Sequence, residues 1–153
     1  MDIRKLVIAS DGSASSAAAV EFGLELAKLR GAEAVVLSVA SPRDLEPLYD
    51  PDEPEAPTQE QLAAASPALA AAQTAAAAIG VAATLELVSA EGTDAVADAI
   101  LGVAAGRDAD AIIIGSRGHS RLAYGVLGSV SHAVLHATSD TTVIVVREPG
   151  GSA

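Results

Sequence analysis

The chain has 153 residues, half of them hydrophobic but only 2% aromatic, so its length suits one domain with a core of Val, Ile, Leu and Ala. A formal net charge of −11 disfavours nucleic acids and anionic membranes as partners, because binding to either depends on positive charge on the protein. The sequence contains no cysteine, which excludes disulfide bonds and thiolate chemistry.

The sequence of residues 1–57 predicts two strands joined by a helix, followed by a loop. A buried strand over residues 5–10 is followed by a helix with Ser13 as its N-cap and Gly31 just past its end, and a second strand covers 34–40. Residues 41–57 contain five of the seven prolines and six acidic residues. We therefore expect a mobile acidic loop without a packed element there, acting as a solvated insertion, a lid or a partner site.

The second half continues the alternation of helices and strands. A helix over 58–80 ends at Gly80, and Pro67 either kinks it or begins its continuous part. Thr93 is expected to cap the next helix, with Val96, Ile100 and Val103 on one face. The remaining elements are strands over 82–90, 110–115 and 141–148 and a helix over 129–138.

This order predicts an α/β fold, a parallel sheet with right-handed crossovers and helices on both faces. We expect one domain over residues 1–148 and a C-terminal tail over 149–153. The first apolar run is too short for a signal peptide, and the alanine-rich residues 67–85 are too weakly hydrophobic for a membrane span. The expected location is the cytoplasm.

The stretch GSRGHSRLAYGVLGS, residues 115–129, holds four glycines and two arginines directly after an apolar strand. Gly115 and Gly118 can adopt positive φ and let backbone amides approach a ligand. Gly128 and Ser129 open a helix, whose N-terminus can hold an anion. The alternative is a flexible loop in which the glycines only make turns.

The spacing Gly115-x2-Gly118-x9-Gly128-Ser129 resembles the nucleotide-binding motif of the universal stress protein family, and the resemblance covers nearly the whole chain. It implies the ATP-binding branch of the family and an adenine nucleotide α-hydrolase-like fold, a single open sheet of five parallel strands in the order 3-2-1-4-5. In that order the first and fourth strands are neighbours, so the segment after each faces one cleft.

The resemblance also implies roles for individual residues around ATP. The match to Asp11 contacts the ribose or a phosphate-bound Mg²⁺ or Mn²⁺ ion, although an Asp-Gly-Ser turn with a purely structural role is the alternative. Independently of the resemblance, Arg117 and Arg121, with His119, add local positive charge to an otherwise negative molecule. Ala9 and Ser10 stand where some relatives have proline and threonine, which leaves the base preference open. The residues matching the triphosphate contacts are Gly115, Gly118, Gly128, Ser129, Val130 and Ser131, and those bordering adenine and ribose are Ala9, Ser10, Val39 and Ile114.

The three histidines of the chain are candidate ligands. His132 and His136 lie four residues apart on a predicted helix, the spacing of two zinc ligands, but no third ligand is arranged locally. A surface or half-buried helix is therefore favoured, and no metal site is predicted there. His119 lies in the glycine-rich loop, where it either touches a phosphate or is solvated.

The last strand is expected at an edge of the sheet if the family's strand order holds. An apolar edge strand is a template for pairing unless it is covered. The resemblance implies a homodimer in which this strand pairs with its copy through Val143, Ile144, Val145 and Val146. The alternative is a monomer whose edge is blunted by Arg147, Glu148 and Pro149.

These observations favour an ATP-binding stress-response or regulatory protein that acts through nucleotide-dependent conformation or partner binding. Little or no catalysis is expected, because no residue is placed to activate water and no Walker-type lysine accompanies the glycines. Two alternatives stay open. One is a slow ATP phosphohydrolase or nucleotidyl transferase that uses Asp11 and His119, and the other is a structural dimer that binds no nucleotide.

Overall fold

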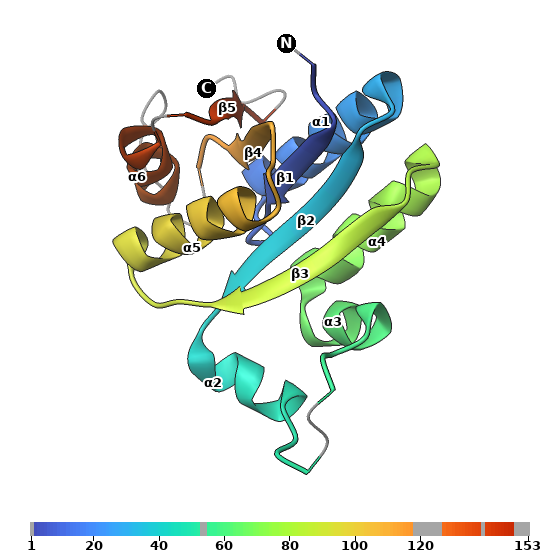
Figure 1. The fold of residues 1–153 in the computed structure, drawn as a ribbon, viewed down its shortest axis with the longest axis vertical. Coiled ribbons are helices and arrows are strands. Elements are labelled where there is room, and N and C mark those ends of the chain that lie inside the picture. Colours follow the sequence, from blue (N-terminus) through green and yellow to red (C-terminus); the bar gives the residue numbers. More distant parts are fainter. Residues whose placement is uncertain (1, 53–54, 118–126, 139, 149–153) are drawn as a thin grey trace.

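The structure is a computed structural model that describes residues 2–52, 55–117, 127–138 and 140–148. Five strands form one parallel sheet in the order β3-β2-β1-β4-β5, which confirms the predicted fold and strand order (Figure 1). Their bounds are β1 Lys5–Ala9, β2 Glu33–Ala40, β3 Ala83–Ser89, β4 Ala111–Gly115 and β5 Thr142–Val146.

Helices cover both faces of this sheet (Figure 1). One face packs against α1 (Ala14–Arg30), α3 (Gln59–Ala65) and α4 (Pro67–Ile79), and the other against α5 (Thr93–Gly106) and α6 (Ser129–Ala137). Within the described ranges, no helix is long and apolar enough to cross a bilayer.

The strands are continuous apolar runs because both faces of the sheet are buried. In β1, Leu6 and Ile8 point into the layer of α1, α3 and α4, while Val7 and Ala9 point toward α5 and α6. Leu6, Val7 and Ile8 are all completely inaccessible to solvent. The carboxyl ends of β1 and β4 are therefore held rigidly side by side.

The first helix begins and ends where the sequence predicts. The Ser13 side chain accepts a hydrogen bond from the Ser16 amide, and Gly31 ends the helix in the left-handed conformation at φ 63°. Gly23 has no room for a side chain, because a Cβ there would lie 2.6 Å from Ile8 Cδ1. This glycine lets α1 pack directly on β1.

The segment 41–57 contains packed structure, so the prediction of a loop without a packed element is wrong. A short helix α2 (Pro42–Leu45) runs into a 3₁₀ turn η1 (Glu46–Leu48), and the Leu45 side chain is buried. Pro42 occupies the first helical turn, where its missing N–H is not needed. The abundant prolines and acidic residues obscured this local start signal.

Two helix boundaries also differ from prediction. The helix predicted over 58–80 is two helices separated by Ser66, which is extended and caps α4 by accepting from the Leu69 amide. Pro67 therefore begins a second helix and does not kink a continuous one. Thr93 is the first residue of α5 and not its cap, because Gly92 at φ 89° takes the N-cap position.

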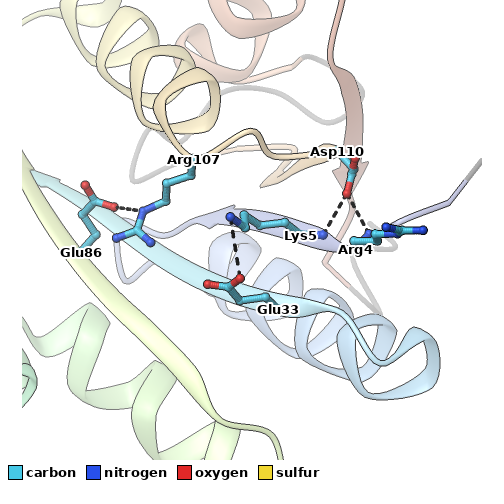
Figure 2. Close-up of polar contacts among 6 residues, drawn as sticks. All are labelled: Arg4, Lys5, Glu33, Glu86, Arg107 and Asp110. Atoms are coloured by element: carbon cyan, nitrogen blue, oxygen red, sulfur yellow. Dashed lines mark hydrogen bonds and ion pairs between the residues drawn. The ribbon is translucent and has the colours of Figure 1, made fainter.

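Hydrogen bonds and ion pairs of polar side chains connect neighbouring segments at and near the amino-terminal ends of the strands (Figure 2). The Asp110 carboxylate accepts hydrogen bonds from the Arg4 and Lys5 amides at 2.7 and 2.9 Å, and these two bonds hold the pKa of Asp110 below its ordinary value. Lys5 also pairs with Glu33 across β1 and β2 at 3.8 Å. A third pair, Arg107 with Glu86, joins the end of α5 to β3 at 2.6 Å.

Candidate functional site

A cavity of about 240 Å³ lies at the carboxyl ends of β1, β2 and β4, bordered by α5 and by the first residues of α6. Eleven of the twelve predicted nucleotide-binding residues line it, and the twelfth, Gly118, lies outside the described residues. The eleven are Ala9, Ser10, Asp11, Val39, Ile114, Gly115, Arg117, Gly128, Ser129, Val130 and Ser131.

The start of α6 presents amide donors at this cavity. Gly128 is the N-cap and has no side chain to satisfy the first amides of the helix. Its own amide donates to the Ser116 carbonyl at 2.6 Å, and its carbonyl accepts from the His132 amide at 3.0 Å. Ser129, Val130 and Ser131 line the cavity and precede this first intrahelical bond. Their amides and the helix dipole suit an anion.

Gly115 is required by a close approach, not by an unusual backbone conformation. Gly115 does not use the positive φ that a glycine can adopt. A Cβ at this position would lie 2.7 Å from both the carbonyl carbon and the Oγ of Ser15. The glycine therefore lets the start of α1 touch the end of β4 beside the cavity, which Gly115 also lines.

Buried serines tie the lining segments together. The Ser131 hydroxyl donates to the Gly115 carbonyl at 2.6 Å, which joins α6 to the end of β4. The Ser15 hydroxyl accepts from the Arg117 amide at 3.1 Å, which joins α1 to the same segment. Ser131 thus has its proton engaged within the protein. The N-cap position of α6 is occupied by Gly128, so no side-chain hydrogen bond caps this helix.

Asp11 shapes the turn between β1 and α1 and also lines the cavity. Its Oδ1 atom accepts from the Ser13 amide at 2.9 Å, and Gly12 in the turn has φ 82°. Asp11 therefore has the structural role in an Asp-Gly-Ser turn that the sequence indicates as an alternative. Of the described residues that line the cavity, Asp11 is the one with a carboxylate side chain.

Apolar side chains from the strands and from α5 supply much of the remaining lining. Ala9, Val39 and Ile114 come from the strand ends, as the sequence indicates. Four further lining residues were not predicted, and they are Ser16, Leu37, Val96 and Ile100. The spacing of Val96 and Ile100 showed that they share a helix face, but only the folded chain shows that α5 turns this face toward the cavity.

Arg117 supplies a positive charge at the cavity, and its guanidinium lies 3.7 Å from the Glu148 carboxylate. His132 and His136 stack edge to face with ring centroids 4.5 Å apart on the exposed side of α6. Across the described part of the chain, no three His, Cys, Asp or Glu side chains gather as a metal cluster. His119 and Arg121 lie outside the described residues.

The strand β5 lies at one edge of the sheet, next to β4. All five of its residues are partly exposed. The four residues predicted to form a dimer interface, Val143, Ile144, Val145 and Val146, are therefore on an edge strand, as the prediction requires.

Comparison with known families agrees with this geometry. The model of the universal stress protein family matches residues 2–147. The chain belongs to the universal stress protein family. No curated protein sequence matches this chain.

Several solved universal stress proteins share the fold over nearly their whole length. One, solved in complex with cAMP, is 24% identical with a TM-score of 0.67, and the match covers 97% of this chain and 99% of that one. The Archaeoglobus fulgidus protein in complex with dAMP is 23% identical with a TM-score of 0.63, over 95% and 99%. Universal stress protein UspA from Lactobacillus plantarum is 19% identical with a TM-score of 0.68, over 96% and 99%.

Proposed function

We propose that this universal stress protein binds an adenine nucleotide, ATP, at the carboxyl edge of its sheet and acts as a regulatory stress-response protein. Nucleotide binding would change its conformation or its affinity for a partner. The observation that carries the proposal is the meeting of two distant segments, Gly115–Arg117 and Gly128–Ser131, around one cavity. Related proteins of this fold have been solved with cAMP and with dAMP, which supports an adenine nucleotide as the ligand class.

The polar and the apolar lining residues suit the phosphate end and the base of a nucleotide. The amides at the start of α6 and the Arg117 guanidinium are donors for phosphate oxygens. Apolar lining residues such as Leu37, Val39 and Ile100 suit a base, and the cavity as a whole has the mixed apolar and polar lining typical of cofactor pockets. Gly118 is assigned to the phosphate end by the motif spacing alone.

A divalent cation, Mg²⁺ or Mn²⁺, is proposed near Asp11. One carboxylate with one oxygen in the turn is a sparse ligand set, so phosphate oxygens and water would have to supply most of the coordination. This fits an ion that arrives with the nucleotide and not one held by the protein alone. The ion would neutralise phosphate charge in a strongly acidic molecule.

The site supports binding more than hydrolysis. The described lining residues include neither histidine nor lysine, and the Asp11 carboxylate is engaged in its own turn. A general base must reach the proton that it removes, and one oxygen of Asp11 already accepts a hydrogen bond from the Ser13 amide. Catalysis is therefore proposed to be absent or slow. ATP turnover above a no-protein control, lost in Asp11→Asn with binding intact, would instead support a phosphohydrolase.

The proposal also includes a homodimer formed by the free edge of β5. The partly exposed residues Val143–Val146 on an edge strand support this pairing.

The test of nucleotide binding is direct. Nucleotide released by acid from the purified protein is identified chromatographically, and ATP, ADP and GTP are then titrated by calorimetry with and without Mg²⁺. We expect saturable binding of ATP, tighter with Mg²⁺, and weaker binding of GTP. The absence of Trp makes intrinsic fluorescence a poor readout. A folded, nucleotide-free protein that binds none of these ligands would refute the proposal.

A further inference from the structure

Arg117 stands between the cavity and an acidic side chain that does not line it. The guanidinium Nη2 lies 3.7 Å from Glu148 Oε2, and the two side chains are 23% and 39% exposed. Arg117 follows β4 and Glu148 follows β5, which pair in parallel with Gly115 opposite Val146. The strand pairing therefore brings this carboxylate to the cavity's one described cation.

The backbone on which Arg117 sits is held from three sides. The Ser116 amide donates to the Val146 carbonyl at 2.9 Å, and the Ser116 carbonyl accepts from the Gly128 amide. The Arg117 amide donates to Ser15 Oγ at 3.1 Å. With its backbone fixed, Arg117 can exchange Glu148 for a ligand in the cavity by a movement of its side chain.

The pair with Glu148 is suited to exchange. Charge-assisted hydrogen bonds between nitrogen and oxygen are about 2.7–2.9 Å long, so a separation of 3.7 Å is a loose ion pair. Partly exposed pairs of this kind add little to stability. A phosphate chain carries more negative charge and more acceptor oxygens than one carboxylate, and guanidinium groups bind it with two parallel hydrogen bonds.

We propose that Glu148 competes with the nucleotide's phosphates for Arg117, and that it thereby limits the affinity of the site for highly charged nucleotides. This inference rests on the proposed nucleotide binding and adds a specificity-determining residue outside the cavity. Glu148 acts through Arg117 and is a positioning residue. Its effect grows with the number of phosphate charges, and it vanishes for a ligand without phosphate.

The first test compares wild-type protein with Glu148→Gln by calorimetry, using adenosine, AMP, ADP and ATP at low and high salt. We expect ATP to bind about two- to fivefold more tightly to the variant, the size of a partly exposed ion pair. The gain shrinks from ATP to AMP, is absent for adenosine, and weakens in high salt. Glu25→Gln on α1 makes the same change in net charge and is the matched control.

A second test separates competition from simple repulsion between Glu148 and the phosphates. If Glu148 acts by holding Arg117, the gain from Glu148→Gln disappears in an Arg117→Ala background. A gain that persists there, or an equal gain in Glu25→Gln, overturns the inference while leaving nucleotide binding intact. If the wild-type protein binds no nucleotide, the proposed function fails and the inference fails with it. Equal ATP affinity of wild type and Glu148→Gln overturns the inference alone.

Discussion

Replacing Ser129 with proline should remove one phosphate donor from the start of α6 without removing the helix. Ser129 is the first residue of α6, where an amide has no intrahelical acceptor and proline is tolerated. Gly128 before it has φ −60° and ψ 154°, an extended conformation that a residue preceding proline readily adopts. The backbone is therefore already arranged for the substitution.

The expected loss follows from the single hydrogen bond removed. A hydrogen bond to a charged group contributes about 1.5–3 kcal/mol, so ATP should bind roughly 10- to 100-fold more weakly to Ser129→Pro than to Ser129→Ala. Ser129→Ala removes the hydroxyl but keeps the amide, and it is the matched control. The difference between the two variants in calorimetry isolates the amide.

Thermal unfolding completes the comparison. Proline in a compatible position should leave stability unchanged or raise it by up to about 1 kcal/mol. Equal ATP affinities for the proline and alanine variants would show that no phosphate binds the amide of residue 129. A marked loss of stability in the proline variant would contradict the position of the helix start and would make its binding result uninformative about the amide.

Three further predictions concern the frame around the site. Asp110→Asn should lower the melting temperature at neutral pH. Because the pKa of Asp110 is lowered in the folded protein, its carboxylate stabilises the fold fully above about pH 4, and this stabilisation is lost as the pH falls through the folded pKa. The melting temperatures of the wild type and the variant should therefore converge in acid. Gly23→Ala should lower the free energy of unfolding by about 1–3 kcal/mol, because its Cβ would overpack against Ile8. Gly102→Ala on α5, whose Cβ would meet open space, should raise it by up to about 1 kcal/mol. Equal denaturant midpoints for the two variants would contradict the close packing of Gly23 on Ile8. Ile144→Glu should raise the monomer fraction in sedimentation, and an unchanged dimer would point to another interface.

The strands and most helix ends were predictable because their signals are local. Strands buried on both faces must be continuous apolar runs, and β1 and β4 are such runs. Ser13 and Gly31 have the side-chain and backbone properties that start and end a helix. The residues 42–48 were missed because one buried leucine among prolines and acids carries no periodicity, although proline also marks a helix start.

The lining of the cavity was predictable at most strand ends and at the start of α6, but not on α5. Residues such as Asp11 and Gly115 follow predicted strands directly, so the strand order of the family brings them together. Val96 and Ile100 lie on a helix that follows β3, at the far edge of the sheet. Their place at the cavity depends on how the crossover lays α5 over β1 and β2, which periodicity does not encode. The pairing of Arg117 with Glu148 likewise requires the register of β4 and β5.

The chain and the proposed nucleotide are both negatively charged, yet binding is possible because the hydrogen-bond donors of the site act at contact distance. The chain has 20 acidic and 9 basic residues, and it would repel a nucleotide at long distance. At physiological ionic strength this repulsion is screened beyond about 8 Å, whereas an amide acts at contact distance. A site built from the amides of α6 and one arginine therefore needs no excess of basic residues. The same reasoning makes Glu148 important, because its carboxylate lies within 4 Å of that arginine and so acts inside the screening distance. Asp11 lines the cavity and also acts at short range, whereas acidic residues farther than about 8 Å from the ligand have little effect.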